Sequence, residues 1–121
     1  MSNRPRVLIA DDHPGIVTAA CQLLALDCDV VGTVADGSTL LETAQRLQPD
    51  VIVLDLHLPK VNGLEACRQI TRTNPNMKVV IFTAVNDQYV RQASLAAGAS
   101  AFVCKLTAGD DLLAAIKRLS S

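Results

Sequence analysis

Acidic, hydroxyl and amino side chains follow four separate apolar runs in this chain. Asp11 and Asp12 come after the first run, Asp55 after the second, Thr83 after the third and Lys105 after the fourth. If these runs are parallel strands of one sheet, their carboxyl ends open at the same edge. Three carboxylates, a hydroxyl and an ammonium group would then meet in one pocket, suited to a divalent cation and a phosphoryl group.

The adjacent carboxylates of Asp11 and Asp12 repel each other unless a cation lies near them. Mg²⁺ prefers oxygen ligands in octahedral geometry and keeps several waters, which two or three carboxylates at neighbouring strand ends can satisfy. Taken alone, an Asp-Asp pair is also ordinary at the start of a surface helix. The combination with Asp55, Thr83 and Lys105 favours a magnesium site.

Asp55 ends the most apolar run of the chain, 51–54. A central strand would hold its carboxylate rigidly, as a nucleophile requires. Attack on a phosphoryl group needs neutralisation of charge on the transferring oxygens, which a metal ion, Lys105 and the Thr83 hydroxyl could supply. Separately, Thr83 is an ordinary strand-end residue and Lys105 an ordinary solvated lysine. Together with Asp55, they indicate a phosphoryl-accepting site.

Short β-branched runs alternate with longer stretches of helical spacing, which predicts an α/β fold built from repeated strand-helix units around a parallel sheet. Five such units fit the length. The predicted strands are Arg6–Ala10, Asp29–Val34, Val51–Asp55, Lys78–Thr83 and Ala101–Cys104. The helix predicted over Tyr89–Ala97 has a mostly alanine apolar face, so we expect it to be shallowly buried and able to move.

The chain has 121 residues, 50% of them hydrophobic and 19% charged, which suits one buried core but not two ordinary domains. No apolar stretch approaches the roughly 20 residues that span a bilayer. Residues 1–5 lack the apolar segment of a signal peptide. We therefore expect one cytoplasmic domain over residues 1–121, without membrane contact.

Composition also argues against several classes of ligand. The net charge of −1, with basic residues scattered singly, lacks the footprint of a nucleic-acid-binding surface. One tyrosine, two phenylalanines and no tryptophan leave no platform for stacking bases. Four cysteines without a Cys-x-x-Cys pair favour free thiols over disulfides and argue against a zinc site built from them: Cys21, Cys28, Cys67 and Cys104.

Four motifs together resemble the receiver domain of two-component response regulators. They are Asp-Asp-His-Pro at 11–14, Asp-Leu-His-Leu-Pro-x-x-Asn-Gly at 55–63, Thr-Ala at 83–84, and Ala-Gly-Ala-x-Ala-Phe-x-x-Lys at 97–105. The resemblance spans essentially the whole chain, and the first motif is most similar to the NarL/FixJ branch. It implies a doubly wound, flavodoxin/CheY-like fold, with five parallel strands in the order 2-1-3-4-5 and five helices.

The resemblance implies a role for each matching residue. Asp55 would accept a phosphoryl group from a histidine kinase or a small phosphodonor, with Mg²⁺ as cofactor. Asp12, Asp55 and the His57 backbone carbonyl would bind Mg²⁺ directly, and Asp11 would act mainly through metal-bound water. Around the phosphoryl group, the remaining contacts would be the Lys105 ammonium, the Thr83 hydroxyl and the Ala84 backbone N–H. His13 is interpreted as a loop residue beside the acids.

The resemblance also implies a conformational switch. Phe102 would move inward as Thr83 is drawn toward the phosphoryl group, and the helix over Tyr89–Ala97 would repack. The face formed by residues 89–119 is then the expected surface for a partner or a homodimer. We expect no enzyme activity beyond the chain's own phosphorylation and dephosphorylation. Members of this branch usually carry a helix-turn-helix output domain, so contact with DNA would come only through a domain outside this chain.

Three alternatives remain at this level. The chain could be a stand-alone receiver that acts through protein contacts. A phosphatase of the haloacid-dehalogenase type also uses an aspartyl nucleophile, but it needs a second acid where this chain has His57. A nucleotide-binding module is disfavoured because no glycine-rich phosphate loop follows the first strand. In addition, Leu106 stands where many family members have a proline, and we expect a trans peptide bond before it.

Overall fold

The computed structural model describes residues 4–107 and 109–120. Five strands form the sheet: β1 (Arg6–Ala10), β2 (Asp29–Val34), β3 (Val51–Leu54), β4 (Lys78–Thr83) and β5 (Ala101–Cys104). Five α-helices connect or follow them: α1 (Pro14–Leu24), α2 (Gly37–Leu47), α3 (Gly63–Thr73), α4 (Gln88–Ala96) and α5 (Gly109–Ser120). A single 3-10 turn, Lys105–Thr107, lies between β5 and α5.

All neighbouring strands pair in parallel, in the order β2-β1-β3-β4-β5, as predicted. Four of the five predicted strand ranges agree with the structure. The third was predicted one residue too long, because β3 ends at Leu54. At Asp55 the backbone turns, and the carboxylate accepts a hydrogen bond from the backbone N–H of His57 at 3.1 Å.

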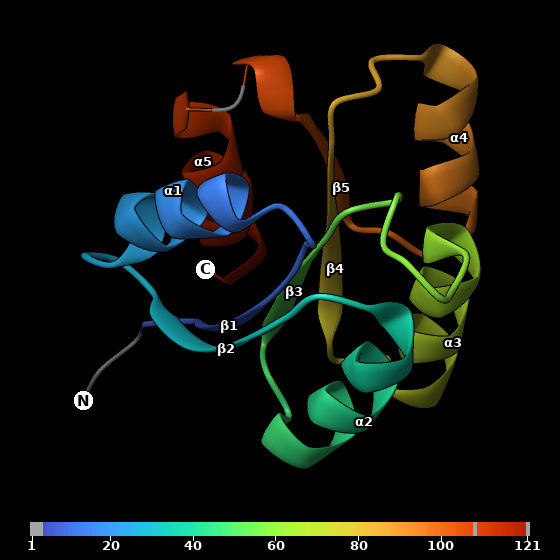
Figure 1. Ribbon diagram of the computed structural model, residues 1–121, viewed down its shortest axis with the longest axis horizontal. Helices are drawn as coiled ribbons and strands as arrows, with labels where there is room; N and C mark the ends of the chain where they lie inside the picture. Colours follow the sequence, from blue (N-terminus) through green and yellow to red (C-terminus); the bar gives the residue numbers. More distant parts are fainter. Residues whose placement is uncertain (1–3, 108, 121) are drawn as a thin grey trace.

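Helices cover both faces of the sheet (Figure 1). Alternate strand residues point to opposite faces, so the sheet carries two separate cores. On one face, α1 and α5 bury residues such as Leu24 and Ile116 against Val7, Ile9 and Val53. On the other face, α2 and α3 pack against a second set of strand residues that includes Leu8, Ile52 and Ile81. Burial on both faces explains why β1, β3 and β4 are almost wholly apolar.

The helix α4 is shallowly anchored, as its alanine-rich sequence predicts. Its buried residue is Ser94, whose hydroxyl donates to the Val90 carbonyl at 2.8 Å. Tyr89 is 82% exposed and Leu95 44% exposed. The helix begins one residue earlier than predicted, because Asp87 caps its first turn by accepting from two backbone N–H groups. It also ends one residue earlier, at Ala96.

Two further expectations are confirmed. The described residues contain no cis peptide bond, so the bond between Lys105 and Leu106 is trans. None of the four cysteines forms a disulfide. Burial raises the pKa of the Cys67 thiol to about 11, which leaves this group protonated near neutral pH. Within the described ranges, no helix has both the length and the apolar character needed to cross a membrane.

We predict that Gly63→Ala destabilises the domain, because Gly63 is where α3 approaches the loop after Asp55. An added Cβ would lie 2.7 Å from Leu56 Cα and 2.8 Å from the Leu56 carbonyl oxygen, so backbone has to move. We expect a loss of about 1–3 kcal/mol in the free energy of unfolding, measured by urea denaturation.

The matched control is Gly15→Ala, in α1. An added Cβ there meets nothing within 4 Å, so the higher helix propensity of alanine should leave stability unchanged or raised by up to about 1 kcal/mol. Equal effects of the two substitutions would contradict the steric explanation.

A pH effect is predicted at the start of α2, where Asp36 is the N-cap. Hydrogen bonds from the Thr39 backbone N–H and from the Ser38 and Thr39 hydroxyls lower the pKa of Asp36 from 3.8 to about 2. Its ionised form therefore stabilises the fold fully above pH 3.8, and this contribution is lost as pH falls toward 2. The difference in unfolding midpoint between the wild type and Asp36→Asn should shrink over that window. A difference independent of pH would contradict the assignment.

Candidate functional site

The register of the sheet brings the predicted residues to one edge. Ala10 pairs with Leu54. The position of Asp55, the next residue, is fixed by a 2.9 Å hydrogen bond from its N–H to the Ala10 carbonyl. Asp11 and Asp55 are therefore neighbours across β1 and β3. On the far side of β4, Thr83 pairs with Cys104, the residue before Lys105. The predicted convergence of strand ends is confirmed.

Two buried carboxylates and one buried ammonium group form the centre of the site. The Asp11 and Asp55 side chains are each 2% exposed, and that of Lys105 is 8% exposed. The Lys105 Nζ lies 2.7 Å from Asp11 Oδ2 and 3.3 Å from Asp55 Oδ2. Both contacts are buried ion pairs. Lys105 thus offsets the repulsion between the two neighbouring carboxylates.

One ammonium group does not balance this site. Asp12, 34% exposed, adds a third carboxylate, so three acids share the one ammonium group of Lys105. The oxygens Asp11 Oδ2 and Asp55 Oδ2 are also buried, and the Lys105 ammonium is the cation nearest to both. Buried polar atoms are normally satisfied, and hard carboxylate oxygens are the ligands of Mg²⁺. The residues present therefore fit a divalent cation.

His13 also belongs to this cluster. Its Nδ1 lies 2.9 Å from Asp11 Oδ1, 3.2 Å from Asp12 Oδ1 and 3.6 Å from Asp55 Oδ2. The hydrogen bond to Asp11 and the nearby charges of Asp11 and Asp12 raise the pKa of His13 above 6.5. The sequence interpretation placed His13 beside the acids but gave it no function. The available signal was its position directly after the acid pair and before Pro14, which restricts the histidine backbone to an extended conformation.

The other predicted residues lie around the cluster. Thr83 is fully buried, and its Oγ1 accepts from the Val85 N–H at 3.3 Å. His57 is exposed, and its backbone N–H donates a hydrogen bond to Asp55 Oδ1. Ala84 is also exposed. Phe102 is half-buried in β5, with the Arg91 guanidinium 5.7 Å from its ring centroid.

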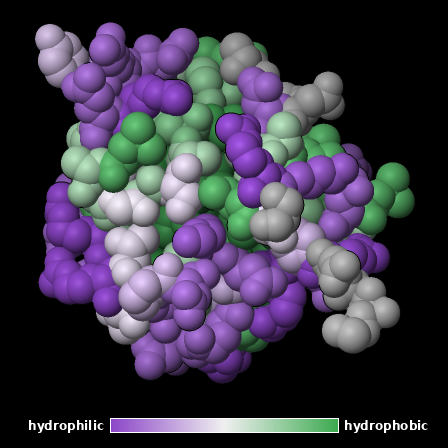
Figure 2. Space-filling model, turned by 180° about the vertical axis from the view of Figure 1, so that it is seen from behind, coloured by the Kyte–Doolittle hydropathy of each residue, from purple (hydrophilic) through white to green (hydrophobic). Residues whose placement is uncertain are grey.

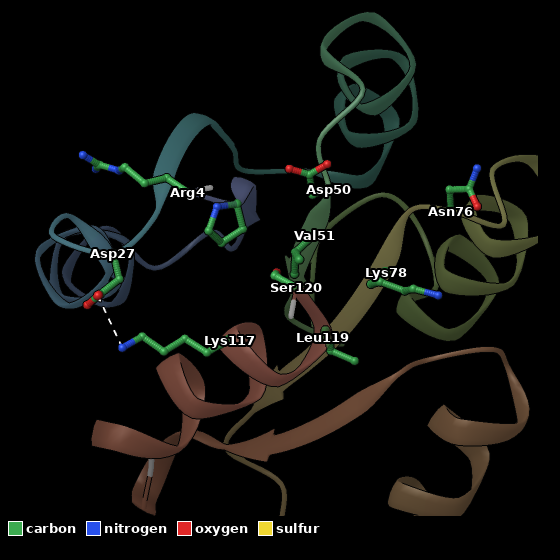
Figure 3. A pocket seen from close by; sticks show the side chains of 10 residues that line it. Arg4, Asp27, Asp50, Val51, Asn76, Lys78, Lys117, Leu119 and Ser120 are labelled. Carbon is green, nitrogen blue, oxygen red and sulfur yellow. Dashed lines mark ion pairs between the residues drawn. The ribbon is translucent and has the colours of Figure 1, made fainter. Parts of the chain in front are cut away.

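A hollow of the described surface lies away from this cluster (Figure 3). It has a volume of about 740 Å³. Asp50 directly precedes β3 and Lys78 opens β4, so this hollow is at the amino edge of the sheet. Lys117 on α5 forms an ion pair with Asp27 at 3.3 Å across part of it. This hollow is therefore at the opposite edge of the sheet from the candidate site.

Comparison with known proteins identifies this arrangement. The family model of the response regulator receiver domain matches residues 7–117. The chain belongs to the response regulator receiver domain family. The signal receiver domain of a putative NarL from Mycobacterium tuberculosis has a TM-score of 0.90 and 25% identity, covering 97% of this chain and 96% of that one. The response regulator domain of Thermotoga maritima CheB has a TM-score of 0.89 and 27% identity, with the same coverage of both chains.

Relatives in sequence support the NarL/FixJ-type branch for this receiver domain. The nitrate/nitrite response regulator protein NarL of Escherichia coli is 33% identical over 125 residues, covering 100% of this chain and 58% of that protein. The transcriptional regulatory protein DegU of Brevibacillus brevis is 32% identical over 117 residues, covering 95% of this chain and 50% of that protein. The receiver domain thus spans about half the length of the curated relatives it matches.

We predict that Lys105→Met destabilises the receiver domain. The substitution leaves Asp11 and Asp55 buried beside each other without a cation, and removal of one partner of a buried pair costs about 3–5 kcal/mol. The free energy of unfolding should be measured by urea denaturation without divalent ions. Lys117→Met is the control, because its ion pair with Asp27 is exposed and contributes about 1 kcal/mol or less. Equal losses would show that Lys105 is not the central cation.

Proposed function

We propose that this receiver domain accepts a phosphoryl group on Asp55 from a histidine kinase or a small phosphodonor. The observation that carries the proposal is the buried Asp55 carboxylate, whose Oδ2 lies 3.3 Å from Lys105 Nζ. In the transfer, an Asp55 oxygen forms a bond to phosphorus while the bond from phosphorus to the donor's leaving group breaks. No separate substrate is turned over, so the proposed activity is signalling rather than enzymatic.

The proposed cofactor is Mg²⁺, held by Asp12, Asp55 and the backbone carbonyl of His57, with Asp11 acting through a bound water. When bound, the ion neutralises charge on the transferring phosphoryl oxygens. Directly after β3, the Asp55 N–H donates to the Ala10 carbonyl and the Asp55 carboxylate accepts from the His57 N–H, so this carboxylate is oriented before the donor arrives. Rigid placement of this kind lowers the barrier to attack.

Three further residues would hold the phosphoryl group. Lys105, already paired with Asp55, would move its ammonium contact to a phosphoryl oxygen. The Thr83 hydroxyl would leave its contact with the Val85 N–H, and the Ala84 backbone N–H would add a second donor. Charge-assisted hydrogen bonds to a dianion are stronger than the neutral contacts they replace, so phosphorylation would favour the rearranged loop.

The loop that follows Thr83 leads directly into the shallowly anchored α4. We therefore propose α4 as the mobile element. Movement of Thr83 toward the phosphoryl group would vacate space for Phe102, whose ring is half-buried beside Arg91. Such coupling needs a segment with a low cost of repacking. A single buried serine in α4 meets that requirement.

We further propose that the face over residues 89–119 binds a partner or a second copy of the chain. Figure 2 shows the side of the molecule turned away in Figure 1, where hydrophobic side chains gather between hydrophilic margins. A groove of the described surface runs between α4, β5 and α5 and is lined by Leu95, Phe102 and Arg118, among others.

The transcriptional regulatory relatives extend well beyond the matched region. We therefore propose a cytoplasmic response regulator whose DNA contacts are made by an output domain outside this chain.

Intact-mass spectrometry after incubation with acetyl phosphate tests the phosphorylation proposal. We expect one phosphoryl adduct on the wild-type chain in the presence of Mg²⁺ and none after chelation of the metal. Asp55→Asn should lose the adduct, because the amide is not a nucleophile. The matched control is Asp29→Asn, an exposed acid at the start of β2, which should keep it. An unchanged adduct in Asp55→Asn would refute the assignment.

A further inference from the structure

The Lys105 ammonium has an aromatic neighbour as well as its two carboxylates. Its Nζ lies over the ring of Phe82, 5.7 Å from the ring centroid. The same atom pairs with Asp11 Oδ2 at 2.7 Å and with Asp55 Oδ2 at 3.3 Å. The face of an aromatic ring carries partial negative charge and attracts a cation within about 6 Å. Phe82 is therefore a third attractive partner of this ammonium group.

The register of the sheet explains why these two side chains meet. Phe82 in β4 pairs with Val103 in β5, and Lys105 follows Val103 by two residues. Side chains two residues apart along a strand point to the same face of the sheet, so Lys105 leaves the end of β5 on the face that carries Phe82. Phe82 is 7% exposed and packs in the core that this face forms with α1 and α5. Its ring is thus held in place by packing.

Burial makes this contact stronger than a cation–π contact at the surface. The Lys105 side chain is 8% exposed, and the attraction between a cation and a ring grows when both are removed from water. Packing alone does not require a ring at position 82, because β4 otherwise buries the aliphatic residues Val79, Val80 and Ile81. An aliphatic side chain at this position would offer the ammonium group no comparable attraction.

The backbone around Lys105 does not place the ammonium group by itself. Lys105 opens a 3-10 turn of three residues, and Leu106 in this turn is 79% exposed, so the residue after the lysine does not anchor the turn in the core. A lysine side chain is long and flexible, and holding it in one position costs rotamer entropy. The position of the ammonium therefore depends on the groups that it contacts.

We propose that Phe82 is a positioning residue for phosphoryl transfer. The face of its ring keeps the Lys105 ammonium in the site while the ammonium exchanges its contact with Asp55 for one with a phosphoryl oxygen. The contact with Asp55 changes during this transfer, whereas the ring stays where the core packs it. The inference rests on the proposed function and adds a residue that acts only through Lys105. Weakening the charge on the ring face should therefore slow phosphorylation without altering Asp55.

The test varies the charge on the ring at nearly constant volume. In the full chain, Phe82 is replaced by phenylalanines that carry one, two or three ring fluorines, which progressively remove negative charge from the ring face. Intact-mass spectrometry follows the rate of phosphorylation by acetyl phosphate with Mg²⁺ in excess. We expect a stepwise fall in this rate, of about five- to thirtyfold with three fluorines, which is the effect of losing a desolvated cation–π contact.

The matched control is unfolding by urea without divalent ions, with Lys105 present and in Lys105→Met. Fluorination should lower the free energy of unfolding stepwise when Lys105 is present and not when methionine replaces it. Effects of fluorine on packing are common to both backgrounds and cancel in this comparison. A second readout leaves Lys105 unchanged: the ¹⁵N NMR resonance of its Nζ should shift with each added fluorine.

The outcomes separate this inference from the proposed function. If the wild type forms the phosphoryl adduct and its rate does not change with fluorination, the role of Phe82 is overturned and phosphorylation of Asp55 is left intact. Equal losses of stability in the two backgrounds, or an unshifted Lys105 resonance, would also overturn it. Absence of an adduct in the wild type would overturn the proposed function and, with it, the role of Phe82 in transfer. A stepwise fall in rate, with a loss of stability that requires Lys105, would support the inference.

Discussion

The Lys105 ammonium between two buried carboxylates is the contact on which the rest of the site depends. Asp11 and Asp55 are brought together by strand register, and register cannot slip without moving every side chain of β1 or β3 to the wrong face. The apolar cores on both faces of the sheet fix that register. Hydrophobic burial thus enforces a juxtaposition of like charges that electrostatics alone would oppose, and Lys105 offsets part of its cost.

The part that Lys105 leaves uncompensated gives the site its chemistry. Three clustered carboxylates, two of them buried, outnumber the ammonium group of Lys105 and favour a cation here. A bound divalent ion would balance these charges and prepare Asp55 for a phosphoryl group. Stability and function are therefore opposed at this edge of the sheet, a common property of sites that bind charged ligands.

The rigidity of the domain is distributed unevenly around this edge. β1, β3 and β4 are buried on both faces and hold the carboxylates and Thr83 in fixed positions. The helix α4, which follows the Thr83 loop, is held by one buried serine and by an aspartate cap. Under the proposed function, a change in charge at the rigid end would be transmitted to the weakly packed end at low cost. This asymmetry suits the family of response regulator receiver domains to signalling.

The sequence alone determined the fold class, four of the five strand ranges, and the gathering of Asp11, Asp12, Asp55, Thr83 and Lys105 at one edge. These follow from apolar periodicity and from the polar residues at strand ends, which are local properties of the chain. Tertiary structure decided that β3 stops at Leu54, that Lys105 pairs with both Asp11 and Asp55, and that His13 turns toward the acids. Side-chain direction and ion-pair partners depend on groups that come from different strands and loops, so only the folded arrangement can specify them.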